Sequence, residues 1–381
     1  MSLFSFCTEY YMALFLLNFF FPCGYFYFYF ASGLCIRIYT FFDFPRSFCG
    51  AQFYEGACVC ACVMYSYNNI VDKGEPLKKD VIDRVPLEIA PTEVVLQSRV
   101  DERVEVLVVE NFLSAAECDR IIAACEEVGY TFWRQKDANA ACDAGQRSGE
   151  TEARAFRVVD TIEACFPQLT RTLSERIQRV VHLEPKLFGP SVTDSEDMFA
   201  RDLAGTWVPL SLSSNLLLGK YGPGGHFSPH IDGSTVVDLN TRSLYTLLIY
   251  LNHCACGGET AIFMGEQADV LELDPQTDKY VGKKEKRVGA VYPKKGSAAF
   301  FFCDVLHEGT PVGEGCCKYI LRGDFLYRRD PPILTTENDK KAFDLYEQAR
   351  VAESNGNAML ACELFQRVRK LSNGVAELYQ L

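Results

Sequence analysis

Short runs of apolar or alternating residues between residues 207 and 329 constrain the fold more strongly than any other feature of the chain. Turn-forming residues separate these runs, and each run has the pattern of a β-strand. The expected strands cover residues 215–220, 228–231, 244–251, 260–263, 297–302 and 318–327. Several short strands at this spacing predict a β-sandwich or a jelly roll.

Helices are expected before this β-rich region. A β-branched run at residues 104–109 predicts a strand, and Ser114 and Glu117 follow it at the spacing of a capping box. Apolar residues at helical spacing then continue to Gly129. A second amphipathic helix is expected over residues 161–181. Its apolar face would contain Leu169, Leu173, Ile177 and Val180.

A helical pattern returns in residues 336–381, on either side of an Asn-Gly turn. The positions of its small residues resemble one tetratricopeptide-type hairpin, which would offer a surface to a protein partner. The alternative is a helical pair that packs on the main domain. The chain is therefore expected to be α+β and mainly β, with a jelly-roll core, flanking N-terminal helices and a C-terminal helical hairpin.

Residues 1–65 differ in composition from the rest of the chain. Residues 10–36 carry no charge, and this stretch exceeds the roughly 20 residues that cross a bilayer. One interpretation is a membrane anchor, after which Arg37 and Arg46 favour a cytoplasmic location for the remainder. The other is an over-extended gene model with initiation at Met64. Both interpretations leave a cytoplasmic folded domain at residues 104–330, which follows a linker at residues 66–103.

The charge and the cysteines limit the partners and the compartment. The net charge of −12 argues against nucleic acid and against anionic membrane surfaces as general partners. The chain has 17 cysteines, but none has the paired Cys-x-x-Cys spacing of a zinc site. They are interpreted as reduced thiols in a cytosol or, alternatively, as partly disulfide-bonded in a secretory lumen.

His230 and Asp232 are separated by one residue. On an extended strand their side chains point the same way, so both can bind one metal ion. With a second, distant histidine they would form the 2-His-1-carboxylate site of non-heme Fe(II) oxygenases. Among the five histidines, His307 is the best candidate for that ligand. His226 and His253 are expected on the surface or beside the site.

Lys318 begins the expected strand that follows His307. Turn residues separate the two segments, and pairing in an antiparallel sheet would bring Lys318 close to His307. A cation near the metal is what a dicarboxylate co-substrate needs at its far end. Arg322 lies on the same face of the strand and is the reserve candidate.

A set of motifs then extends through the β-rich region. The motifs are Tyr221-x-x-Gly224-x-x-Phe227-x-x-His230-x-Asp232-Gly233, Tyr250-Leu251-Asn252, Gly257-Gly258-Glu259-Thr260, Pro293-Lys294-Lys295-Gly296-Ser297-Ala298 and His307-x-Gly309-x-Pro311-Val312 leading to Lys318-Tyr319. With these motifs, residues 104–329 resemble the prolyl 4-hydroxylase-type branch of the Fe(II)/2-oxoglutarate dioxygenases.

The resemblance implies roles for individual residues. His230, Asp232 and His307 would be the catalytic iron ligands, Lys318 would bind the distal carboxylate of 2-oxoglutarate, and Tyr221 and Tyr250 would line that pocket. It also implies Fe(II), 2-oxoglutarate and O₂ as cofactors, with ascorbate as a reductant.

One departure from the family pattern lies just before Lys318. Two residues, Cys316 and Cys317, stand between Gly315 and Lys318, where the family has one. A β-bulge is expected to absorb the additional residue.

The implied reaction is hydroxylation of a C–H bond in a protein or peptide, with proline as the expected residue and with release of succinate and CO₂. One alternative is an oxygenase of the same fold that acts on a small molecule or lipid. Another is a non-catalytic adaptor that uses the C-terminal helices, which the intact ligand set disfavours. Substrate specificity is expected to reside in loops at residues 138–152, 191–205 and 264–289.

Overall fold

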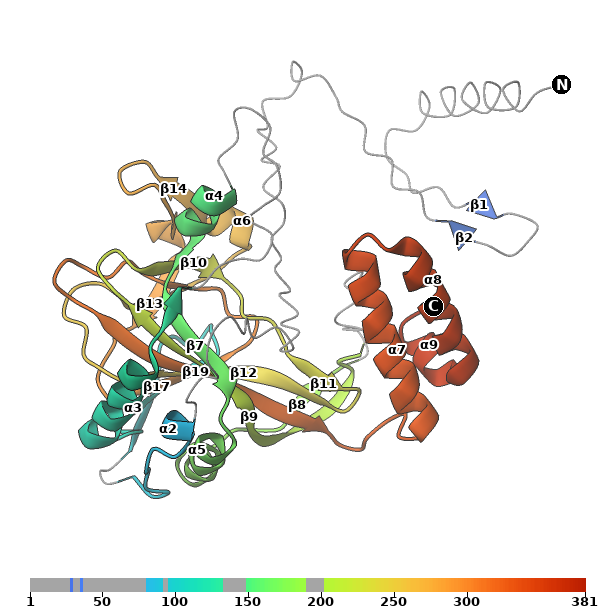
Figure 1. Cartoon of the computed structure of the whole chain (residues 1–381), viewed down its shortest axis with the longest axis horizontal. Helices are drawn as coiled ribbons and strands as arrows, with labels where there is room; N and C mark the ends of the chain where they lie inside the picture. The colour runs from blue at the N-terminus through green and yellow to red at the C-terminus, as the bar shows by residue number, and fades with distance from the viewer. Residues whose placement is uncertain (1–27, 30–34, 37–79, 92–94, 133–148, 190–201) are drawn as a thin grey trace, which may run out of the picture. The chain divides into compact units, whose positions relative to one another are not determined.

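The computed structural model describes residues 28–29, 35–36, 80–91, 95–132, 149–189 and 202–381 (Figure 1). The chain divides into two compact units, residues 1–59 and 60–381. In the first unit, β1 (Phe28–Tyr29) pairs with β2 (Cys35–Ile36). The rest of the expected anchor, and Met64, lie outside the described residues. In the described part of the chain, no helix is both long enough and apolar enough to cross a bilayer.

Two antiparallel sheets form the centre of the second unit. The larger sheet has the strand order β3 (Leu96–Arg99), β4 (Val106–Glu110), β17 (Ala298–Phe302), β12 (Thr241–Tyr250), β19 (Lys318–Arg329), β9 (Gly205–Tyr221), β7 (Asp160–Cys165) and β5 (Thr131–Phe132), with β11 (Val236–Asp238) on β12 and β8 (Lys186–Phe188) on β9. The smaller sheet has the order β16 (Arg287–Val291), β13 (Thr260–Phe263), β18 (His307–Gly309), β10 (His226–His230) and β6 (Arg157–Val158). The six strands expected from the sequence are all present, and β9 begins well before its predicted start.

The two sheets share an apolar core between their inner faces. Tyr250 and Phe301 of the larger sheet pack in one cluster with Ile262 and Val291 of the smaller sheet. Alternate residues of the same strands, such as Leu247 and Phe300, belong to a second cluster on the outer face of the larger sheet. This alternation is the pattern of strands buried on both faces. The antiparallel arrangement agrees with the expected jelly roll.

Helices α2 (Asp80–Asp83), α3 (Ala115–Val128) and α5 (Pro167–Val180) contribute to the outer cluster and lie together in Figure 1. The capping box of α3 is confirmed: the Glu117 backbone N–H donates to the Ser114 hydroxyl, and the Ser114 backbone N–H donates to the Glu117 carboxylate. Two parts of the expected linker thus belong to the folded unit: Ile82 of α2 is buried in the outer cluster, and β3 pairs with β4.

The predicted helix at residues 161–181 has the wrong start. Residues 160–165 form β7, which pairs with β9, and α5 begins only at Pro167. Ile162 and Ala164 are buried at strand spacing, and a proline in the first turn is favourable because its missing N–H would have no helical partner. The apolar face of α5 is otherwise as predicted, with Leu169, Leu173 and Ile177 buried.

The expectation of a charged loop at residues 264–289 is also wrong. This segment contains α6 (Gln267–Val270), a separate hairpin of β14 (Leu271–Asp274) with β15 (Lys279–Gly282), the short helix η2 (Lys284–Lys286) and most of β16. In the other two predicted loops, residues 138–148 and 191–201 lie outside the described residues. Residues 149–152 belong to α4 (Gly149–Phe156), and Gly205 starts β9.

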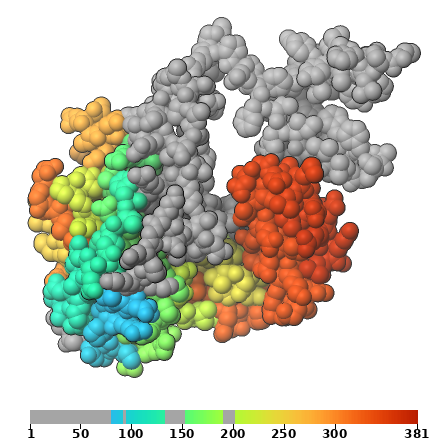
Figure 2. Space-filling model, viewed as in Figure 1, coloured from blue at the N-terminus to red at the C-terminus, as the bar shows by residue number. Residues whose placement is uncertain are grey.

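The C-terminal segment forms α7 (Glu337–Ser354), α8 (Ala358–Leu371) and α9 (Asn373–Leu378). These helices cluster with Leu239, which lies between β11 and β12. The Tyr379 hydroxyl donates to Asp202 Oδ2 at 2.9 Å, so a buried polar contact joins the chain end to the β domain. Figure 2 shows the surface of these helices in red beside the yellow surface of the adjoining strands.

Candidate metal centre and co-substrate pocket

Adjacent strands of the smaller sheet bring His230 and His307 together, and Asp232 follows just beyond the end of the first strand. His230 ends β10, His307 begins β18, and the two histidines are register partners. Asp232 Oδ1 lies 3.7 Å from His230 Nε2, and Asp232 Oδ2 lies 3.8 Å from His307 Nε2. One potential ligand atom from each residue lies within 4.8 Å of the others. The described residues contain no second cluster of this kind.

Backbone carbonyls orient the two imidazole rings. His230 Nδ1 bonds to Ser228 O at 2.7 Å, and His307 Nδ1 bonds to Val305 O at 2.9 Å. Each Nδ1 therefore carries the proton, and each Nε2 presents its lone pair to the cluster. Burial lowers the pKa of both imidazoles, which keeps them in the neutral form that binds metals.

Asp232 is held as a carboxylate. Burial alone would raise its pKa, but Arg322 and the neighbouring histidines hold the pKa well below its usual range. Arg322 Nη2 lies 3.4 Å from Asp232 Oδ1, and the Thr246 hydroxyl donates to Asp232 Oδ2 at 2.7 Å. Two imidazole nitrogens and one carboxylate oxygen on one side of a buried point fit Fe(II) and leave other coordination positions for substrates.

Lys318 occupies the inner face of the larger sheet as the first residue of β19, opposite Tyr221 of β9. Its Nζ lies 5.2 Å from the ring centre of Tyr221 and 5.6 Å from that of Tyr250. The residue is 3% exposed, and burial lowers its pKa to about 8. No described carboxylate lies within ion-pair distance of Nζ, so this cation fits an incoming carboxylate.

The additional residue before Lys318 produces no bulge at this point of β19. The register with β9 is regular from Lys318 to Gly323. The turn accommodates the residue instead: Gly315 has a φ of 73°, a value that favours glycine, and the Asn252 side-chain amide donates to Cys317 O at 2.8 Å. The expected β-bulge is therefore wrong, and Lys318 still faces the inside of the domain.

Arg322 lies beside the candidate metal-binding cluster and not beside Lys318. Its Nη2 also contacts Asp324 Oδ1 at 3.0 Å, so it interacts with two carboxylates. His226 is fully buried and its Nε2 contacts Ala155 O at 2.9 Å, whereas His253 is exposed. Neither His226 nor His253 belongs to the cluster.

Sequence reasoning missed a stack of side chains beside His230. The Phe227 ring lies parallel to the His230 ring with 3.5 Å between centroids, and the Arg157 guanidinium lies 4.4 Å above the Phe227 ring. Arg157 belongs to β6, which pairs with β10. Phe227 belongs to one of the sequence motifs, but nothing in the sequence around it indicates a contact with Arg157, which lies 70 positions earlier.

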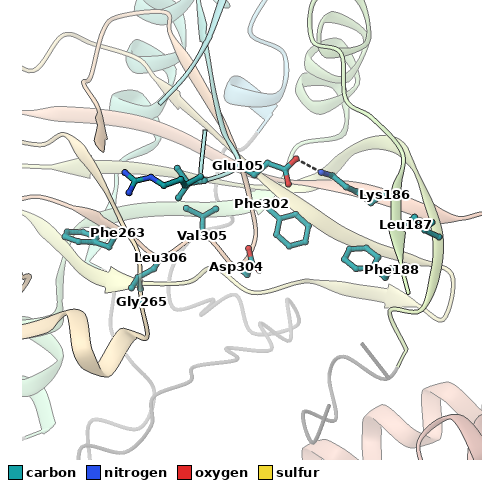
Figure 3. A pocket seen from close by; sticks show the side chains of 12 residues that line it. Glu105, Lys186, Leu187, Phe188, Phe263, Gly265, Phe302, Asp304, Val305 and Leu306 are labelled. Atoms are coloured by element: carbon teal, nitrogen blue, oxygen red, sulfur yellow. Dashed lines mark hydrogen bonds and ion pairs between the residues drawn. The ribbon is translucent and has the colours of Figure 1, made fainter. Parts of the chain in front are cut away.

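A groove of about 480 Å³ lies next to the strand that carries His307 (Figure 3). Val305 and Leu306 line it immediately before His307. The other lining residues are Arg103, Val104, Glu105, Lys186, Leu187, Phe188, Phe263, Gly265, Phe302 and Asp304. The groove thus combines phenylalanine rings with two carboxylates, and Glu105 is paired with Lys186.

The comparison with protein families gives one match. Residues 216–325 match the model of the 2OG-Fe(II) oxygenase superfamily, and this range contains all three residues of the cluster and Lys318. No curated protein sequence matches the chain.

Solved structures provide distant matches. A viral collagen prolyl hydroxylase from Paramecium bursaria Chlorella virus-1 is 19% identical, with 59% of this chain and 96% of that chain covered and a TM-score of 0.31. A Pseudomonas putida prolyl-4-hydroxylase is 16% identical, with 59% and 93% covered and a TM-score of 0.32. A Trichoplax adhaerens prolyl hydroxylase, in complex with a hypoxia-inducible factor peptide fragment, is 16% identical, with 59% and 84% covered and a TM-score of 0.32.

Proposed function

We propose that this chain, which carries a domain of the 2OG-Fe(II) oxygenase superfamily, hydroxylates a C–H bond of a protein or peptide, with proline as the expected residue. The single observation that carries the proposal is the pairing of a buried His-Asp-His cluster with the buried ammonium of Lys318. Lys318 is close enough to influence the pKa of His307. The first group suits Fe(II), and the second suits a carboxylate of a co-substrate bound beside it.

Each residue has a defined part in this proposal. His230, Asp232 and His307 hold the iron, which when bound supplies the activation of O₂ and the oxidation of the C–H bond. Lys318 pairs with the distal carboxylate of 2-oxoglutarate, while Tyr221 and Tyr250 flank it. Arg322 keeps Asp232 ionised. Burial of these groups excludes water from the reacting atoms, and ascorbate is the proposed reductant.

The groove beside His307 supports a polypeptide substrate over a small molecule. It is open at the surface, since Leu187 on its edge is 78% exposed. Its phenylalanine rings offer apolar contacts to an extended chain. A polypeptide lying in the groove would pass the strand that begins with His307.

The direct test is succinate formation from 2-oxoglutarate by purified, Fe(II)-loaded protein in the presence of peptide substrates. We expect turnover by the natural protein and its loss in His230→Ala, together with loss of bound iron. His253→Ala is the matched control, because it removes an exposed histidine outside the cluster and should leave turnover unchanged. Iron-loaded protein that neither binds nor consumes 2-oxoglutarate would show that the proposal is wrong.

A further inference from the structure

A row of side chains crosses the inner face of the larger sheet at the level of Asp232. Glu163 of β7 is the register partner of Leu217 of β9, and Leu217 is the register partner of Arg322 of β19. The row continues on β12 with Leu248, which belongs to the core between the two sheets. Because register partners project from the same face of a sheet, Glu163 faces the same side as Arg322 and the cluster.

The charged side chains on this side of the sheet differ in whether they have a partner. Arg322 contacts the carboxylates of Asp232 and Asp324. Arg157 also lies on this side, with its guanidinium over the Phe227 ring. Glu163 differs, because no described residue forms a hydrogen bond or an ion pair with its carboxylate.

Burial raises the pKa of Glu163, while Coulombic attraction by Arg157 and Arg322 opposes the rise. Glu163 is partly buried. A partly buried carboxylate without a hydrogen-bond partner loses hydration, and attraction by Arg157 and Arg322 replaces it only in part, because the pKa is still raised. A ligand that brings a positive charge to this position would supply the missing interaction.

We infer that Glu163 determines substrate specificity by binding a basic side chain next to the residue that is hydroxylated. This inference rests on the proposed function, and it adds the chemistry of the peptide. A lysine or arginine side chain gives Glu163 a counter-ion in a partly desolvated position, where such a bond is stronger than at the surface. An acidic group would instead meet the carboxylate of Glu163, since Asp232 and Asp324 are already paired with Arg322.

Two further features agree with a basic peptide. Asp304 in the groove beside His307 forms no ion pair with a described residue, and it lies close enough to Glu105 for repulsion to help raise its pKa. The net charge of −12 favours encounter with basic polypeptides through long-range attraction.

The experiment compares peptide pools on the full chain. Each fluorescein-labelled pool has a degenerate central residue and one fixed flanking position that holds lysine, norleucine or glutamate. Binding is measured by fluorescence anisotropy on protein loaded with Mn(II) and 2-oxoglutarate, and turnover by succinate formation with Fe(II). At one flanking position we expect lysine pools to bind at least about tenfold more tightly than norleucine pools, a difference of about 1.4 kcal/mol, because a charge-assisted hydrogen bond to Glu163 is lost in the norleucine pools.

The variant Glu163→Gln keeps the size of the side chain and removes its charge, so the lysine-to-norleucine ratio should fall to about one. Glu377→Gln is the matched control, since it removes one carboxylate from the exposed surface of α9 and should keep the full ratio. Thermal melting of both variants checks that the fold is retained.

The outcomes separate the two proposals. Equal binding of the pools, preference for glutamate, binding of no pool, or a ratio that survives in Glu163→Gln would each overturn the role of Glu163. Binding of 2-oxoglutarate is measured without peptide. Protein that binds 2-oxoglutarate but has no basic preference contradicts only the specificity inference, whereas protein that binds no 2-oxoglutarate contradicts the proposed function itself.

Discussion

Replacement of Lys318 by methionine should stabilise the protein in the absence of 2-oxoglutarate. Burial lowers the pKa of Lys318 to about 8 from 10.5. At about 1.4 kcal/mol for each pKa unit, the buried ammonium costs about 3 kcal/mol of folding free energy near pH 7. Methionine has a similar length and no charge, so Lys318→Met should recover about 2–3 kcal/mol, which is a rise in Tm of roughly 4–12 °C for a domain of this size.

The same substitution should weaken the binding of 2-oxoglutarate. The proposed ion pair with the distal carboxylate is buried, and loss of one partner of such a pair costs about 3–5 kcal/mol. The Kd for 2-oxoglutarate should therefore rise by about a hundredfold to a few thousandfold. Stability and affinity thus change in opposite directions, which a general disturbance of the fold would not produce.

The pH dependence of both quantities follows from the protonation of Lys318. Its destabilising effect is complete below pH 8, where the side chain is charged in the folded and unfolded states, and it disappears as the pH rises to 10.5. The stability advantage of Lys318→Met should shrink over the same interval. The affinity of the natural protein for 2-oxoglutarate should fall by about tenfold for each pH unit above 8, whereas that of the variant should lack this transition.

Differential scanning fluorimetry without ligand and calorimetric titration of 2-oxoglutarate into Mn(II)-loaded protein measure these effects. Lys294→Met is the matched control, because Lys294 forms an exposed ion pair with Glu110, and such pairs contribute about 0–1 kcal/mol. If Lys318→Met melts no higher than the natural protein, the ammonium is not desolvated as described. If the variant binds 2-oxoglutarate as tightly as the natural protein, Lys318 is not the carboxylate partner.

Two further predictions concern buried polar contacts away from the His-Asp-His cluster and Lys318. The Arg176 guanidinium donates to Glu117 at 2.6 Å, and both side chains are at most 2% exposed. Arg176→Met leaves the Glu117 carboxylate buried without this partner, so urea unfolding should show a free energy of unfolding lower by about 3–5 kcal/mol. A decrease below about 1 kcal/mol would contradict the buried pair. Tyr379→Phe removes the hydrogen bond to Asp202, so hydrogen exchange should accelerate in residues 373–378, with a local loss of about 1–3 kcal/mol. Unchanged exchange there would mean that this contact does not hold the chain end.

The candidate ligands could be predicted from the sequence because their relation is mainly local. The spacing of His230 and Asp232 predicts that both can reach one metal ion, and they do lie together although β10 ends at His230 and Asp232 follows just beyond it. Only a few histidines compete for the third position. The sequence alone does not separate Lys318 from Arg322 as the candidate residue for binding the co-substrate carboxylate, because both residues lie on the same face of β19. Only the register with β9 and the contacts of Arg322 with Asp232 and Asp324 separate them.

The segment at residues 264–289 was wrongly predicted to be a loop for a different reason. The hairpin of β14 and β15 is joined to neither of the two large sheets, and Leu273 is exposed. Because neither face of this hairpin is completely buried, its sequence does not have to alternate between apolar and polar residues. Its many charged residues therefore resemble those of a loop. Pairing between Glu272 and Val281 is a property of the folded hairpin that composition does not encode.

The wrong start of the second helix has a larger consequence, because it concealed Glu163. The apolar positions at Ile162 and Leu169 fit a helix that continues backwards from α5, and on such a helix Glu163 would be an ordinary charged residue on a solvated face. Residues 160–165 instead form a strand because β7 pairs with β9, and their side chains therefore alternate between the two faces of the sheet. Ile162 and Ala164 then enter the outer core, and Glu163 must face the inside, on the same side of the sheet as Arg322. A carboxylate in that position is costly unless a ligand compensates it, which is why the residue that the sequence hid is the one to which we assign substrate specificity.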